Sequence, residues 1–165
     1  MKQEAEFAKL LTWAYRGEIS GEVLFETLAE AFGGAHRVKL ALLRDLEREM
    51  STALAPLLSR YGVTGGDDLR SHITGRENAE RMAALSWSNF LRRFAPVTDD
   101  AISRYRRLAA LCPDEDQPIL RLLIAHEDAL RDFAETELKG TGDSSLDSVN
   151  EVLRSLRAHR TEARS

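Results

Sequence analysis

The sequence is poor in the residues and segments that define several large classes of protein. Its single cysteine, Cys112, excludes an internal disulfide framework and a cysteine-rich zinc site. No apolar run approaches the roughly 20 residues that a membrane-spanning helix needs. No apolar signal region follows the first residues either. We therefore expect a cytoplasmic protein without a membrane segment.

Basic residues are also outnumbered. The 165 residues include 23 Lys and Arg against 27 Asp and Glu, which gives a net charge of -4. Nucleic-acid-binding proteins present basic surfaces, so this balance disfavours nucleic acid as a partner. Charged residues make up 30% of the chain and hydrophobic residues 43%. These fractions are typical of a globular protein and argue against global disorder.

Strand patterns are nearly absent, and the helix formers Leu, Ala, Arg and Glu dominate instead. Apolar residues recur at helical spacing in four long segments, over residues 4–32, 35–61, 67–94 and 116–138. Shorter helices are expected over 99–111 and 146–156. The short links between the first three long helices favour antiparallel neighbours. The sequence thus predicts an all-α protein, an antiparallel four-helix bundle with two additional short helices.

The predicted bundle occupies residues 1–139. Residues 140–165 would add a glycine-containing linker, the short last helix and a polar tail. Two boundaries stay open at this stage. The first helix could break at Gly17, and the third could begin at Thr74, which forms a capping-box pattern with Glu77.

Charged side chains fall on the apolar faces of these helices, where they are unexpected. At 100° per residue the set comprises Glu18 and Glu22 on the first helix, Glu47 on the second, Glu80 on the third, and His126 and Glu127 on the fourth. Glu22 and Glu47 lie almost equally far from the glycines between their helices. Antiparallel packing would therefore gather these residues in one layer at mid-height.

Several ionised carboxylates in an apolar layer repel one another and are poorly solvated. They need a compensating cation, or they must take up protons. Two divalent metal ions bridged by carboxylates meet that need, and helix bundles use inward glutamates and Glu-x-x-His pairs to hold them. The six residues are therefore the predicted metal ligands.

The run from Gly17 to Glu22 with Phe25, together with Glu47 and the pair His126-Glu127, resembles the ferritin-like superfamily, near rubrerythrin-like proteins. The resemblance covers residues 4–138. It implies a four-helix bundle with a carboxylate-bridged di-iron or di-manganese centre, and hence an oxidase, oxygenase or metal-handling role. No organic cofactor is evident from the sequence.

The sequence departs from the family pattern of Glu-x-x-His on two helices. Met50 stands where a histidine would follow Glu47, and His126 directly precedes Glu127. A carboxylate-rich site, a single-metal site and a lost site all stay open, as does the question whether the protein is an enzyme. The substrate of such a site is not identified by the sequence.

The alternative is a metal-free helical bundle that acts as a dimerisation or protein-interaction module. In that case arginines would neutralise the glutamates, with Arg44 near Glu47 and Arg131 near Glu127. The apolar face of the last helix, over residues 146–156, would pack on a partner chain. We expect a homodimer.

Overall fold

The computed structural model describes residues 2–66 and 68–162, and the regular structure in that part of the chain is helical throughout. The helices are α1 (Lys2–Phe32), α2 (Gly34–Arg60), α3 (Asp68–Ala83), α4 (Trp87–Leu111), α5 (Gln117–Leu138) and α6 (Asp147–Glu162). The predicted all-α class is confirmed. Among the described residues, no helix combines the length and apolar character needed to cross a membrane.

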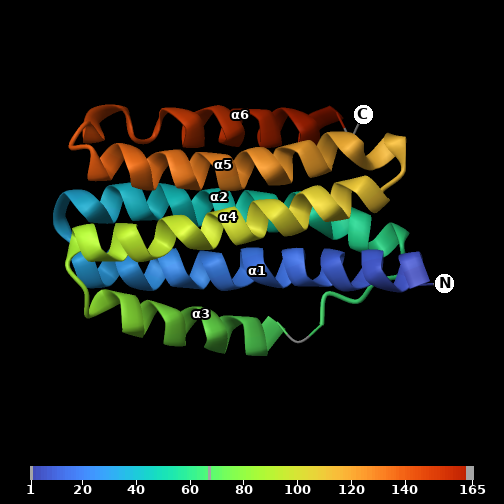
Figure 1. Cartoon of the computed structure of the whole chain (residues 1–165), viewed down its shortest axis with the longest axis horizontal. Coiled ribbons are helices and arrows are strands. Elements are labelled where there is room, and N and C mark those ends of the chain that lie inside the picture. Colours follow the sequence, from blue (N-terminus) through green and yellow to red (C-terminus); the bar gives the residue numbers. More distant parts are fainter. Residues whose placement is uncertain (1, 67, 163–165) are drawn as a thin grey trace.

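Successive helices reverse direction and lie side by side along one long axis (Figure 1). α1 packs against α2, α3 and α4, whereas α5 packs against α4, α6 and α2. These contacts bring α1, α2, α4 and α5 around a common apolar core. α3 and α6 lie at opposite edges of the molecule, α3 against α1 and α6 against α5 and α2 (Figure 1).

The reversal between α1 and α2 depends on two glycines. Gly33 and Gly34 have φ angles of +61° and +50°, in the left-handed region that other residues rarely adopt. α1 itself continues through Gly17, so the open question of a break there is settled. The tight turn sets the level at which residues of α1 and α2 face each other, and Glu18 meets Glu47 across this pair.

The predicted third helix, over residues 67–94, is wrong. The chain breaks after Ala83, and α4 begins at Trp87. Ser86 caps the new helix, because its hydroxyl accepts a hydrogen bond from the Asn89 backbone N–H at 3.3 Å. The predicted first residue, Asp67, lies outside the described residues.

The prediction of a separate helix over 99–111 is also wrong, because these residues belong to α4. α4 runs without interruption from Trp87 through Pro96 to Leu111. Proline in a helix removes one backbone hydrogen bond, but packing of the surrounding turns outweighs that loss. Thr98 lies within the helix, and its hydroxyl donates a hydrogen bond to the Ala95 carbonyl at 2.6 Å.

α3 packs on α1 through small side chains rather than large ones. Its buried residues are Ser71, Gly75 and Ala79. A Cβ atom at Gly75 would overlap the backbone carbonyl of Ser20 on α1, so the two helices approach closely here. Leu69 and Ile73 lie on the apolar face that the sequence predicted to be buried together with Glu80, but they are 68% and 51% exposed. The predicted inward face of this helix is therefore wrong.

α6 belongs to the same core. It extends to Glu162, beyond the predicted end at residue 156, and residues 163–165 lie outside the described part of the chain. The apolar stripe that the sequence offered to a partner chain is buried within this chain, against α5 and α2; it consists of Val149, Val152, Leu153 and Leu156. The predicted partner face is therefore wrong.

Candidate metal centre

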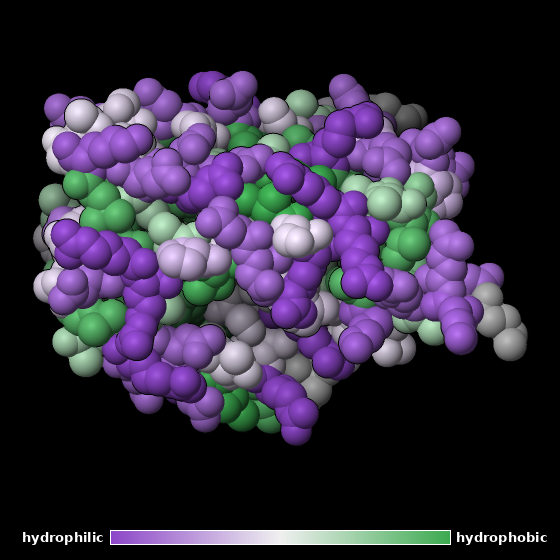
Figure 2. Space-filling model, viewed as in Figure 1, coloured by the Kyte–Doolittle hydropathy of each residue, from purple (hydrophilic) through white to green (hydrophobic). Residues whose placement is uncertain are grey.

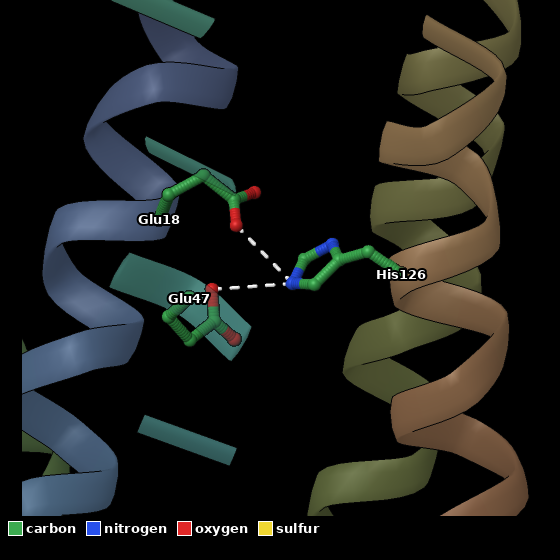
Figure 3. A group of neighbouring side chains, drawn as sticks. All are labelled: Glu18, Glu47 and His126. Atoms are coloured by element: carbon green, nitrogen blue, oxygen red, sulfur yellow. Dashed lines mark ion pairs between the residues drawn. The ribbon is translucent and has the colours of Figure 1, made fainter. Parts of the chain in front are cut away.

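Three polar side chains from three helices converge in the apolar core (Figure 3). Glu18 of α1, Glu47 of α2 and His126 of α5 are 1%, 4% and 0% exposed. The Nε2 atom of His126 lies 3.1 Å from Oε2 of Glu18 and 3.2 Å from Oε2 of Glu47. The three residues were each predicted to face the core, and the structure brings them together.

The spacing of these atoms fits ligands of a common metal ion. Divalent metals bind imidazole nitrogen and carboxylate oxygen at about 2.0–2.2 Å. Two ligands that lie 3.1 or 3.2 Å apart would then subtend about 95–100° at the ion, within the range of common coordination geometries. The ligand atoms of Glu18, Glu47 and His126 all lie within 4.8 Å of one another, so the three side chains form one compact group.

A single N–H group on His126 does not account for both contacts. Nε2 of His126 lies almost equally far from two carboxylate oxygens, and an N–H group can point well at only one acceptor. Neither Nε2 of His126 nor Oε2 of Glu18 has a hydrogen-bond partner. Buried polar atoms are normally paired, so these two atoms fit a ligand that binds both.

The second polar atom of each side chain has its own contact, which leaves Nε2 of His126 and Oε2 of Glu18 available to a ligand. Nδ1 of His126 faces the Leu123 carbonyl at 3.4 Å, and a proton on Nδ1 leaves the lone pair on Nε2. The hydroxyl of Tyr105, on α4, donates to Oε1 of Glu18 at 2.9 Å. That contact occupies one carboxylate oxygen and orients the other toward His126.

Burial dominates the electrostatics of the cluster. It raises the pKa of both Glu18 and Glu47 well above the usual range, while nearby His126 partly offsets the effect at Glu18. Burial also raises the pKa of the neighbouring Glu127 to about 8. The pKa of Tyr105 rises because the phenol is buried and faces the charge of Glu18. Without a cation, the cluster therefore tends to hold protons.

A glycine on α1 makes room for one of the carboxylates. A Cβ atom at Gly21 would lie 2.6 Å from Cδ of Glu47 and 2.8 Å from its Oε2, closer than side chains pack. Gly17, one turn earlier, has only an ordinary 3.7 Å contact with the Tyr105 hydroxyl. The missing side chain at Gly21 therefore leaves space for the carboxylate of Glu47.

The other predicted ligands are not part of the three-residue group. Glu127 is buried beside it, 9% exposed. Glu22 is partly exposed and accepts a hydrogen bond from Nε of Arg48 at 2.7 Å. Glu80 is exposed on α3. Its predicted place in the buried layer is wrong, because α3 turns its small residues inward instead.

Arginine does not neutralise the buried glutamates. Arg44 pairs with Asp45 at 2.8 Å, and Arg131 pairs with Asp99 and Asp128. In residues 2–66 and 68–162, no Lys or Arg forms an ion pair with a carboxylate of the buried set, which comprises Glu18, Glu47 and Glu127. The predicted arginine pairing of Glu47 and Glu127 is therefore wrong.

The sequence analysis missed Tyr105 as a functional residue. Tyr105 stands among Arg104, Arg106 and Arg107, a run that indicates a solvated helix face. The helical period does place it in line with buried Ala101 and Leu108, and this phase could have identified it.

No protein-family model, curated protein or solved structure matches this chain. The class to which it belongs is therefore defined by its own architecture, an all-helical protein with a buried Glu-Glu-His group.

Proposed function

We propose that this chain is a ferritin-like metalloprotein in which α1, α2, α4 and α5 form the four-helix bundle. Glu18, Glu47 and His126 would hold one divalent transition-metal ion at its centre. The observation that carries the proposal is the pair of unpartnered atoms, Oε2 of Glu18 and Nε2 of His126, which lie 3.1 Å apart in the buried core.

Two carboxylates and one imidazole suit iron(II) or manganese(II), which accept oxygen and imidazole ligands readily. Three protein ligands leave coordination positions open for a substrate or an oxidant, as catalytic sites require. The di-metal centre that the resemblance implies needs more donors, and Glu127 is the adjoining buried carboxylate. A single ion is the arrangement that the converging atoms support best.

The function that fits this site is a small non-haem oxidase or oxygenase. The bound ion would supply Lewis acidity and electron transfer. Tyr105 holds Glu18 in its ligating orientation through the 2.9 Å hydrogen bond. Glu127, with a pKa of about 8, can accept or release a proton near neutral pH beside the centre.

Elemental analysis of protein purified without chelator tests the proposal, before and after anaerobic reloading with ferrous iron or manganese. We expect about one ion per chain in the parent, since the three donors converge on one point. The Glu47→Gln variant should lose the ion. Glu80→Gln is the matched control, because it removes an exposed carboxylate and should leave metal binding unchanged.

A folded parent that takes up no ion contradicts the proposal. Equal losses in Glu47→Gln and Glu80→Gln would contradict it too, since the effect would then not arise in the core. Circular dichroism of each variant identifies any loss that follows from unfolding.

The metal-free interaction module is the weaker proposal. It drew on arginine pairs and on a free apolar face of the last helix, and the described residues provide neither. A homodimer stays a prediction that light scattering of the purified protein can test.

A further inference from the structure

A groove of about 440 Å³ lies between α3 and α4, with α1 as its floor. Seen from the side of α4, the surface is recessed between the polar rows of α4 and α3, and weakly polar residues show in the recess (Figure 2). The volume falls within the range of small-molecule sites. The groove reaches the candidate metal centre, because Glu47 is part of its lining.

The walls of the groove are apolar. Large side chains of α1, α4 and α5 form them: Trp13, Leu24, Phe25, Phe94, Val97 and Leu130. Val97 is 54% exposed, so part of this apolar surface is in contact with water and would be covered by a bound molecule. Aromatic side chains are prominent in the walls, and aromatic rings pack favourably against one another. The walls therefore suit a ligand with an apolar body, and a ring in particular.

The charged residues at the mouth of the groove do not select an ion. Asp100 pairs with Arg104 at 3.1 Å, and Arg70 has an interaction partner of its own. Arg16 is exposed, and its Nε donates to the Gly65 carbonyl at 3.0 Å. Ionic contacts with an exposed, hydrated side chain contribute little to binding. A ligand therefore gains little from a charged group at this end.

The inner end of the groove offers a hydrogen-bond acceptor. Gly17 on the floor has no side chain, and a Cβ atom there would lie 3.7 Å from the Tyr105 hydroxyl. That hydroxyl donates its proton to Glu18, so its oxygen can still accept a hydrogen bond from a ligand. Glu47 and Glu127 also line this end. Their charge is offset by protons in the metal-free protein and by the ion in a metal-loaded one, so an ionic ligand would meet no net opposite charge.

We propose that the groove binds an uncharged alcohol or phenol with an apolar body. The body lies between the apolar walls, and the hydroxyl group lies at the inner end, where it donates a hydrogen bond to the Tyr105 oxygen. The inference deepens the proposed function by naming the class of molecule that reaches the centre. It rests on that function only for the fate of the bound molecule, because binding itself requires no metal.

Isothermal titration of the metal-free protein at neutral pH with four naphthalene derivatives tests the inference. 2-Naphthol is the uncharged donor, and 2-methoxynaphthalene has a similar shape without the O–H group. We expect 2-naphthol to bind about fivefold more tightly, because a neutral hydrogen bond contributes on the order of that factor. 2-Naphthoate and 2-naphthylmethylammonium should bind about tenfold more weakly than 2-naphthol, since burial of an unpaired ion opposes binding.

Tyr105→Phe tests the hydrogen bond itself. Without the phenol oxygen, 2-naphthol and 2-methoxynaphthalene should bind equally, because the acceptor that distinguishes them is gone. If Tyr105 only supported the fold, the substitution would weaken both ligands alike and leave their affinity ratio unchanged.

Two further substitutions obstruct the groove from different sides. Gly17→Leu fills the floor on α1, and Thr74→Trp introduces a large side chain on α3; each should weaken 2-naphthol binding at least about tenfold. Glu26→Leu and His72→Trp are the matched controls, because they change exposed residues of the same helices that do not line the groove. Both controls should bind 2-naphthol like the parent. Circular dichroism of each variant identifies any loss that follows from unfolding.

The inference is overturned if 2-naphthol does not bind, if either ion binds more tightly than 2-naphthol, or if both obstructed variants bind it like the parent. An unchanged affinity ratio in Tyr105→Phe overturns it too. Elemental analysis of the parent after metal reloading keeps the two proposals apart. A parent that takes up metal and does not bind 2-naphthol overturns the ligand class alone. A parent that binds 2-naphthol and takes up no metal overturns the proposed function alone.

Discussion

Alanine substitutions at Gly17 and Gly21 on α1 should have different effects on metal binding, although the chemical change is the same. Both Gly17 and Gly21 lie inside the helix, where alanine is favoured over glycine by about 0.8–1.0 kcal/mol. A Cβ atom at Gly17 meets only the Tyr105 hydroxyl at 3.7 Å, an ordinary contact. Gly17→Ala should therefore stabilise the protein by up to about 1 kcal/mol and leave the metal centre intact.

Gly21→Ala carries the same helical gain but displaces a ligand. Its Cβ atom would lie 2.6–2.9 Å from the carboxylate atoms of Glu47, and that group must move away. The end of a glutamate side chain is flexible, so the fold survives. Movement away from His126, now at 3.2 Å, removes one of three donors. We expect metal affinity to fall at least about tenfold, or 1.4 kcal/mol.

Two assays on each variant test this reasoning. Urea denaturation of the metal-free proteins measures the helical gain, and titration with manganese(II) measures the affinity. If Gly21→Ala binds manganese(II) as tightly as Gly17→Ala, Glu47 is not a ligand and the assigned centre is wrong. If both variants lose affinity equally, the effect belongs to the helix and not to the carboxylate.

Three further predictions follow from single contacts. Gly75→Ala should destabilise the protein by about 1–3 kcal/mol in urea, because its Cβ atom would overlap the Ser20 carbonyl; an unchanged midpoint contradicts the close packing of α3. Tyr105→Phe should weaken manganese(II) binding about tenfold in a titration, because Glu18 loses the hydrogen bond that orients it; unchanged affinity refutes that role. Glu127 has a folded-state pKa of about 8 against its ordinary 4.5, so the folded metal-free protein binds an extra proton between these values. Its stability should fall by up to about 1.4 kcal/mol per pH unit as the pH rises through this window. Urea denaturation across the window should show that slope reduced in Glu127→Gln, and an undiminished slope would assign it to other groups.

Features that depend on one helix at a time were predictable from the sequence. The 100° period placed Glu18, Glu47 and His126 on buried faces, and all three are less than 5% exposed. The turn at Gly33 and Gly34 was predictable in the same way, although counting residues from it placed Glu22 rather than Glu18 level with Glu47. In these cases the local pattern and the tertiary packing agree, which is the condition for reading one from the other.

The prediction errors arise where two helices pack through small residues that allow a close approach, and not through large apolar side chains. α3 carries Leu69 and Ile73 at helical spacing, and the pattern predicts that this side faces inward. Gly75 lets the opposite side approach α1 more closely, and that packing determines the orientation. The misplacement of Glu80 follows from this one error, because its predicted phase was measured against Ile73.

The extent of α4 was mispredicted because proline and serine signals compete. Pro96 predicts a break, whereas Ser86 offers a cap ten residues earlier. The helix capped by Ser86 buries Phe90 and Phe94 before it reaches the proline. Burial of two aromatic side chains contributes several kcal/mol, on the order of the roughly 3 kcal/mol that an interior proline costs. Only the tertiary contacts decide between the two signals.

The opposing effects of protons and a metal ion connect the fold to the proposed function. Burial raises the pKa of Glu18, Glu47 and Glu127, so rising pH withdraws protons that the metal-free core needs and lowers its stability. A metal ion competes with those same protons and binds only the folded arrangement. Rising pH therefore increases metal affinity and, at saturating metal, the stability that binding adds. The metal-free and metal-loaded proteins should thus respond to pH with different slopes. If the buried carboxylates only shared protons and bound no metal ion, stability would change with pH at the same rate with and without added metal.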